Sequence, residues 1–211
     1  MDSRLRLGVL VSGGGTNLQA IIDGIENGSV PAEIACVVSN NKNAYALERA
    51  RAHGIYGVAV LKKNFESPGA YEDEIIKILR EHNCGLVVQA GFLVVLGEKF
   101  VRAFENRIIN VHAALIPSFC GKGYYGLKVH EAVLRKGCKV TGATVHFVND
   151  EIDGGPIILQ KAVEVKDGDT PEILQRRVMA EAEHVILPQT ITLFAEGRIV
   201  LENNMARVIG G

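Results

Sequence analysis

The chain has 211 residues, of which 47% are hydrophobic and 22% charged, and its formal net charge is −1. This length suits one well-buried domain, and the balanced charge excludes a broad electrostatic field that would attract nucleic acid or a membrane surface. The apolar run that opens the chain is too short for a signal peptide or a membrane span, so we predict a cytoplasmic protein. Because the four cysteines form no zinc-type pair, we expect no metal site.

Strand-like and helical segments alternate through the first half of the chain. This alternation is typical of an α/β protein with a largely parallel sheet. Ser67 and Pro68 are the residue types that open a helix. We predict strands at 5–11, 32–39, 57–61 and 84–90, and helices at 18–28, 44–54, 68–79 and 97–104.

The second half has longer strands and fewer helices. Thr170 and Pro171 open the one helix predicted here, and we expect Pro188 to kink it. The fold class predicted for the domain, 1–211, is an open, mostly parallel, Rossmann-like twisted sheet with helices on both faces and antiparallel strands in its C-terminal part. We predict single strands at 107–113, 141–148, 155–165 and 197–209.

The segment "SGGGTN" at 12–17 lies between a predicted strand and a predicted helix. Backbone N–H groups and the helix dipole make such a turn an anion site, although turn sterics alone also explain the glycines. The segment is not a Walker A loop, because it lacks the Gly-Lys-Ser/Thr ending, and it is not a dinucleotide fingerprint, because Leu18 stands at the third glycine position. We therefore favour a bound monophosphate.

Asn110 and His112 lie two residues apart on a predicted strand, so their side chains share a face. A hydrogen-bonded pair that closes the strand is the simpler interpretation. However, ligands of open α/β sheets bind at the carboxyl ends of the strands, where this pair lies.

Three acidic residues, Asp150, Glu151 and Asp153, crowd a loop that ends in two glycines. A solvated turn explains them equally well. If this loop meets the end of the strand that carries His112, a carboxylate there would favour the protonated imidazole. With no nucleophile elbow in the sequence, these groups suggest direct group transfer with oxyanion stabilisation.

Five ordered motifs resemble the folate-dependent formyltransferases, from about Leu7 to Leu201. The motifs are "SGGGTNLQAII", "AGFLVVL", "INVHAALIPSF", "TGATVHFV" and "DEIDGGPIILQ". The resemblance implies transfer of a formyl group from the co-substrate 10-formyltetrahydrofolate to the amine of glycinamide ribonucleotide. It also implies a phosphate-binding half at about 1–105, a catalytic and folate-binding half at about 106–211, and a monomer or homodimer that binds small molecules.

The resemblance also assigns roles to residues. Asn110, His112 and Asp153 match the catalytic residues of the family. The substrate-binding residues of the family match Gly15, Thr16, Asn17 and Glu183. Without the resemblance, we would interpret Glu183 as a solvated charge on a helix. His146 could support the site from behind or be a core histidine with its hydrogen bonds satisfied, and we slightly favour the core histidine. The folate-binding residues implied are Leu93, Val94, Val95, Leu96, Asn110, Asn149, Asp150, Glu151, Ile152 and Asp153.

The sequence departs from the family after the histidine, where Ala113 and Ala114 replace the usual proline and serine. We expect this change to alter the rate rather than the reaction. The loop 121–126 is rich in glycine, which permits a mobile lid. Lys62 and Lys63 are the candidates for gripping the folate tail.

Several other functions fit parts of the sequence. Methionyl-tRNA formyltransferase and formyltetrahydrofolate hydrolase share the Asn-His-Asp residues, but each normally carries a further domain for which we expect no room here. A silent nucleotide-binding module would not need all three residues. A dinucleotide-dependent oxidoreductase would need an acidic residue where Ser39 and Asn40 end the second strand.

Overall fold

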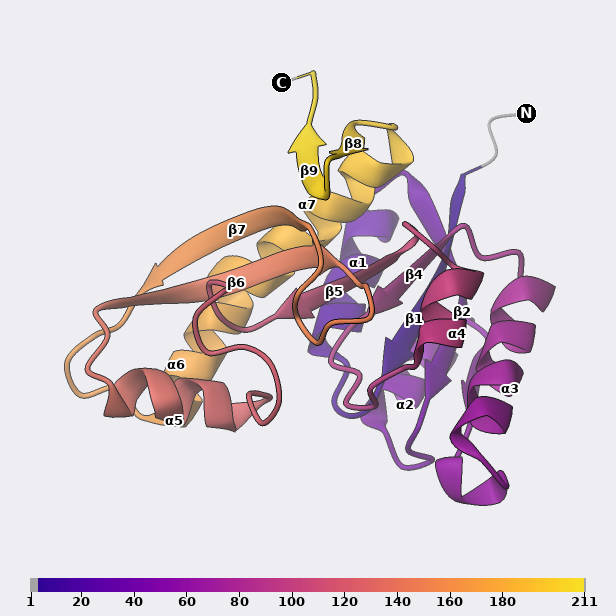
Figure 1. The fold of residues 1–211 in the computed structure, drawn as a ribbon, viewed down its shortest axis with the longest axis horizontal. Coiled ribbons are helices and arrows are strands. Elements are labelled where there is room, and N and C mark those ends of the chain that lie inside the picture. Colours follow the sequence, from indigo (N-terminus) through magenta and orange to yellow (C-terminus); the bar gives the residue numbers. More distant parts are fainter. Residues whose placement is uncertain (1–3, 211) are drawn as a thin grey trace. The chain divides into compact units, whose positions relative to one another are not determined.

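The structure is a computed structural model that describes residues 4–210 (Figure 1). Residues 1–3 and 211, which belong to the predicted domain, lie outside the described residues. The chain divides into two compact units at the bond between Ile109 and Asn110. In the described part, no helix combines the length and apolar character needed to cross a membrane.

The first unit confirms the predicted alternation of strands and helices. Strands β2 and β4 each pair in parallel with β1, and β3 pairs in parallel with β2. Ser67 caps α3 as expected, accepting a hydrogen bond from the Ala70 N–H. The elements are β1 (Leu5–Val11), α1 (Thr16–Glu26), β2 (Ala32–Ser39), α2 (Tyr45–Ala52), β3 (Gly57–Ala59), a 3₁₀ turn (Lys62–Asn64), α3 (Pro68–Glu81), β4 (Leu86–Gln89) and α4 (Glu98–Ala103).

The strand order β3-β2-β1-β4 makes β1 the point at which the chain reverses its direction across the sheet. Right-handed crossovers then place α1 and α2 on one face and α3 on the other. In agreement, α1 contacts α2, and α3 contacts α4. The loops that leave β1 and β4 therefore lie side by side, and the Ser12 N–H donates to the Gly91 carbonyl at 3.1 Å.

The second unit is built around a long antiparallel pair of strands, β6 and β7, as predicted (Figure 1). Strand β5 begins at the end of the first unit and carries Asn110 and His112. The sheet has seven strands in the order β3-β2-β1-β4-β5-β6-β7. The remaining bounds are β5 (Ile108–His112), α5 (Leu127–Arg135), β6 (Val140–Phe147), β7 (Ile157–Glu164), α6 (Pro171–Val178), a π-helical turn (Met179–Glu183), α7 (His184–Ala195), β8 (Ile199–Glu202) and β9 (Met205–Val208).

Helix α5 is absent from the sequence prediction, which has one helix in this half. It begins after Gly126, which contributes no capping side chain, so the usual start signal is missing. Its buried stripe includes His130, which weakens the apolar periodicity on which a helix prediction rests.

The prediction of one strand at 197–209 is wrong. Asn203 and Asn204 have φ values of 49° and 60°, and they turn the chain back so that β9 pairs antiparallel with β8. Asparagine tolerates this left-handed conformation better than most residues, which is why an Asn-Asn pair makes a hairpin turn. The hairpin forms a separate two-stranded sheet.

The helical segment that contains Pro188 is irregular before the proline. Pro188 is inside α7, while the π-helical turn covers Met179–Glu183. A proline clashes with the carbonyl four residues before it, here that of His184, so the chain adjusts on the N-terminal side of the proline.

We expect Gly142→Ala to destabilise the protein. Gly142 lies on β6 opposite Ala162, and an added Cβ would overlap the Lys161 carbonyl oxygen and lie 2.8 Å from Leu115 Cδ2. The two strands would have to separate, at a cost of about 1–3 kcal/mol. Urea unfolding would measure the loss.

Gly69→Ala in α3 is the control for Gly142→Ala. The nearest atom to its added Cβ is Ser67 Oγ at 3.9 Å, and the helix favours alanine by up to about 1 kcal/mol. Equal losses of stability in the two variants would contradict the packing argument.

Candidate active site

The first unit places two of the predicted binding segments together. The glycine loop, residues 12–15, joins β1 to α1, and Gly15 adopts a left-handed φ of 70° at the helix start. Ser12 Oγ accepts a hydrogen bond from the Leu93 N–H at 2.9 Å, which ties the glycine loop to the segment 93–96. In that segment Leu93 and Val95 are exposed, whereas Leu96 is buried. The segment therefore exposes two apolar side chains beside the glycine loop.

Asn110 on β5 is oriented by His146 on β6. His146 Nδ1 lies 2.7 Å from the Phe147 carbonyl, which only accepts, so Nδ1 carries the proton. Burial lowers the pKa of His146, and the neutral ring therefore accepts at Nε2 from Asn110 Nδ2 at 3.1 Å. This bond sets the direction of the Asn110 amide and leaves a second N–H on the same nitrogen for a ligand.

His146 thus contributes more to the site than the sequence analysis favours. It is a satisfied core histidine, as expected, but one of its two partners is the Asn110 side chain. Its Nε2 also lies 3.8 Å from Asp153 Oδ1. No local sequence pattern identifies this role, because it depends on β6 lying beside β5 in the sheet.

His112 lies between a backbone carbonyl and Asp153. Its Nε2 is 2.9 Å from the Phe119 carbonyl, so this nitrogen is the donor. Its Nδ1 faces Asp153 Oδ2 at 3.7 Å, which is too long for a direct hydrogen bond. Nδ1 is therefore the nitrogen that faces the carboxylate.

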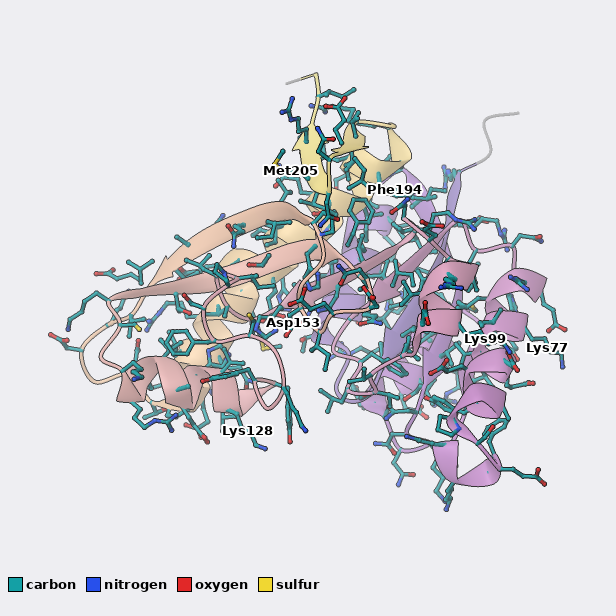
Figure 2. All side chains as sticks on the ribbon, in the orientation of Figure 1. Lys77, Lys99, Lys128, Asp153, Phe194 and Met205 are labelled. Carbon is teal, nitrogen blue, oxygen red and sulfur yellow. The ribbon has the colours of Figure 1, made fainter. Side chains whose placement is uncertain are left out.

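Asp153 stands on the loop between β6 and β7 (Figure 2) and has a left-handed φ of 55°. Its Oδ2 accepts from the Gly121 N–H at 2.8 Å, so the loop after β5 meets the acidic loop, as the sequence analysis allowed. Glu151 N–H donates to Asn149 Oδ1 at 3.1 Å, which closes a tight turn ahead of Asp153. Of the three acidic residues, Asp153 is the one recorded beside a histidine.

The segment that contains Ala113 and Ala114 is held by β6 and β7. Thr144 Oγ1 donates to the Ala114 carbonyl at 2.7 Å and accepts from the Ile116 N–H at 3.1 Å and from Gln160 Nε2 at 3.0 Å. Gln160 also donates to the Ile116 carbonyl at 2.9 Å. The hydroxyl uses its whole hydrogen-bonding capacity, and the loop is anchored without the usual proline and serine.

Glu183 is buried, at 6% exposure, and ends the π-helical turn, which contacts β6 and β7. The interpretation of this residue as a solvated helix charge is therefore wrong.

His130 on α5 is an additional buried histidine that the sequence analysis missed. It has no exposed surface, and among the residues described neither ring nitrogen has a hydrogen-bond partner. Burial, helped by the nearby charge of His112, lowers the pKa of His130 to about 4. The ring is therefore neutral at physiological pH.

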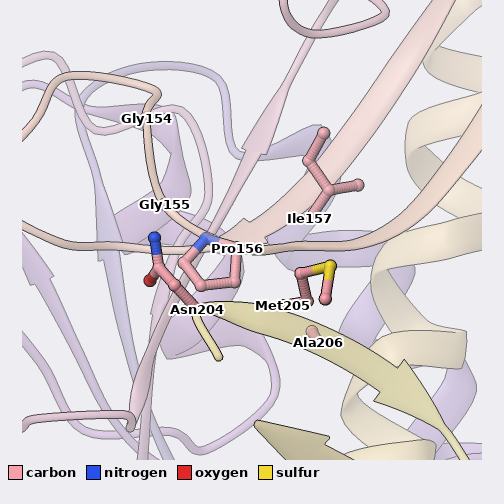
Figure 3. A pocket seen from close by; sticks show the side chains of 7 residues that line it. All are labelled: Gly154, Gly155, Pro156, Ile157, Asn204, Met205 and Ala206. Carbon is pink, nitrogen blue, oxygen red and sulfur yellow. The ribbon is translucent and has the colours of Figure 1, made fainter. Parts of the chain in front are cut away.

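A hollow of about 370 Å³ lies between Gly154–Ile157 and Asn204–Ala206 (Figure 3). Pro156, Ile157 and Met205 supply its side chains together with Asn204. The residues that line it include no acidic, basic or charged side chain.

The formyl transferase family matches residues 5–191. The phosphoribosylglycinamide formyltransferase of Escherichia coli (strain K12) is 40% identical over 202 residues, which cover 96% of this chain and 92% of the relative. The crystal structure of glycinamide ribonucleotide transformylase 1 from Symbiobacterium toebii aligns with a TM-score of 0.93 at 43% identity, over 98% of this chain and 95% of that chain. A formyltetrahydrofolate deformylase from Pseudomonas syringae pv. tomato gives a TM-score of 0.88 at 25% identity, over 99% and 67% of the two chains.

We expect His130 to make the fold sensitive to acid. Its pKa is near 6.5 when unfolded and about 4 when folded, so between these values the unfolded chain binds more protons and stability falls as the pH falls. This one group contributes a loss of about 2 kcal/mol between pH 7 and pH 5. Urea unfolding at the two pH values would measure it.

His130→Leu should remove this contribution to the loss of stability between pH 7 and pH 5. His53→Leu, at an exposed site, is the control: it leaves His130 in place, so the loss of stability should remain. An unchanged difference between pH 7 and pH 5 in His130→Leu would show that another group is responsible.

Proposed function

The chain belongs to the formyl transferase family, and on that premise we propose that it acts in purine biosynthesis as a glycinamide ribonucleotide formyltransferase. It transfers the formyl group of 10-formyltetrahydrofolate to the amine of glycinamide ribonucleotide, giving formylglycinamide ribonucleotide and tetrahydrofolate. The observation that carries the proposal is the arrangement of Asn110, His112 and Asp153, with His146 behind the asparagine.

In the proposed reaction the neutral amine attacks the formyl carbon, and a new C–N bond forms. The oxyanion that develops is stabilised by the free N–H of Asn110 and by protonated His112. Asp153 helps to remove the proton from the attacking nitrogen and to deliver it, through water, to N10 of the folate. The C–N10 bond then breaks with its electron pair on N10, so charge and protons balance.

Substrate binding is proposed from the family and is supported by the chemistry of each segment. Gly15, Thr16 and Asn17 hold the phosphate, because helix and turn N–H groups favour an anion. Glu183 binds the ribonucleotide. Asn110 and the segments Leu93–Leu96 and Asn149–Asp153 bind the pterin. The assignment of residues 1–211 to one domain, with binding and catalytic halves, belongs to the same proposal, as does a cytoplasmic location.

A hydrolase is the second candidate, favoured by the similarity to the Pseudomonas syringae deformylase. The two functions differ in the acceptor, which is water in one and the ribonucleotide amine in the other. We expect purified protein to deformylate 10-formyltetrahydrofolate, followed by absorbance, only when glycinamide ribonucleotide is present. Turnover at the same rate without the ribonucleotide would establish the hydrolase.

Asp153→Asn and His112→Ala should each lower kcat by at least about 100-fold, because each removes a group that interacts with the transition state. Phosphate binding should be unchanged, since the glycine loop belongs to the other unit. Steady-state kinetics and titration with inorganic phosphate measure the two effects.

Asp167→Asn, at a fully exposed aspartate paired with Lys139, is the matched control and should keep wild-type activity. Loss of phosphate binding in step with turnover in both site variants would contradict the roles assigned to Asp153 and His112.

A further inference from the structure

Helix α2 holds two consecutive carbonyl groups of the glycine loop. The Ala46 N–H donates to the Gly13 carbonyl at 3.1 Å, and Arg49 Nε donates to the Gly14 carbonyl at 2.8 Å. A Cβ atom on Gly15 would lie 2.6 Å from Ala46 Cβ, so the loop reaches the helix only because residue 15 is glycine. Loop and helix are thus joined by two hydrogen bonds and a close backbone approach.

These two bonds determine where the N–H groups of the loop point. In a trans peptide the C=O and N–H point in opposite directions. Because the Gly13 and Gly14 carbonyls point to α2, the N–H groups of Gly14 and Gly15 point away from it. The Gly15 carbonyl accepts from the Gln19 N–H at 2.9 Å, so the Thr16 N–H likewise points out of the start of α1. Successive N–H groups directed in this way form an anion site.

The space beside these groups is open. A Cβ atom on Gly13 or Gly14 would meet nothing within 4 Å. Among residues 4–210, no hydrogen bond is recorded for the N–H groups of Gly14 and Gly15. Gly14 is exposed and Gly15 is half-buried, so both N–H groups are accessible to an external acceptor.

Arg49 also brings an uncompensated positive charge to the loop. Its Nη1 donates to Gln19 Oε1 at 2.9 Å, and its Cζ lies 5.0 Å from the centre of the Tyr45 ring. Both partners are neutral, and within the described part of the chain Arg49 forms no ion pair. By contrast, Arg51 on the same helix is exposed and paired with Glu48.

We propose that Arg49 is a positioning residue that shapes the glycine loop for a phosphate monoester. It binds the Gly14 carbonyl and so directs the Gly15 N–H to the phosphate, while its charge strengthens the field that the dianion meets. Arg49 acts through the loop and touches no reacting atom. The inference rests on the proposed function, in which this loop holds the phosphate of the ribonucleotide.

Arg49→Met tests the proposal, and Arg51→Met on the same helix is its control. Removing a charge-assisted hydrogen bond should raise KM for glycinamide ribonucleotide by about 10-fold to 100-fold. kcat should stay within about threefold, and KM for 10-formyltetrahydrofolate should not change. Arg49→Lys should give an intermediate KM, because lysine keeps the charge but cannot bind Gly14 and Gln19 with one planar fork. Arg51→Met should behave as wild type.

Titration with inorganic phosphate gives a readout that needs no turnover. In protein labelled with ¹⁵N-glycine, the amide signals of Gly14 and Gly15 should shift and saturate, and Arg49→Met should weaken this binding by a factor similar to its effect on KM. A change in overall stability alone would not raise the KM of one substrate and leave the other unchanged.

The role of Arg49 is overturned if Arg49→Met matches Arg51→Met in KM and in phosphate affinity, or if phosphate leaves both glycine signals of the wild type unmoved. If the wild type transfers no formyl group to the ribonucleotide, the proposed function fails. The phosphate titration still decides the role of Arg49 in that case, because unchanged phosphate affinity in Arg49→Met would refute it.

Discussion

The Asp153 carboxylate, between the imidazoles of His112 and His146, is the constraint on which the site in the C-terminal unit depends. It lies 3.7 Å from His112 Nδ1 and 3.8 Å from His146 Nε2, and its side chain is only 11% exposed. A carboxylate at such a place needs compensating donors. The Gly121 N–H supplies one, so the carboxylate that faces both imidazoles also joins the two loops that surround it.

The two imidazoles differ because their partners differ. His146 donates a hydrogen bond from Nδ1 to a carbonyl and accepts one from Asn110 at Nε2. Only the neutral ring allows this arrangement. His112 donates a hydrogen bond from Nε2 to a carbonyl, and its Nδ1 faces a carboxylate. This arrangement is also compatible with the imidazolium form of the ring. One ring therefore orients an amide, while the other faces a carboxylate. Similar side chains acquire separate roles from the backbone acceptors around them.

Local rules predicted most of the fold and failed where tertiary contacts compete with them. The strands of the first unit follow from continuous apolar runs, and α3 follows from the Ser67 cap and Pro68. Helix α5 has no such cap and buries a histidine, so its stability comes from packing against other elements, including α6. The turn at Asn203–Asn204 could have been predicted, since asparagine favours left-handed turns. The apolar residues on both sides of it favour one continuous strand instead.

The sequence by itself determined the alternating fold, the glycine loop and, through ordered motifs, the family with its asparagine, histidine and aspartate. Spacing along the chain carries this information because strand and turn geometry are local. Only the tertiary structure decided that His146 orients Asn110, that Glu183 is buried, and that Arg49 holds the glycine loop. These contacts join residues 35 or 36 positions apart in the two hydrogen-bonded cases. Hydrogen-bond direction and burial depend on which elements meet in space, and no local pattern records that.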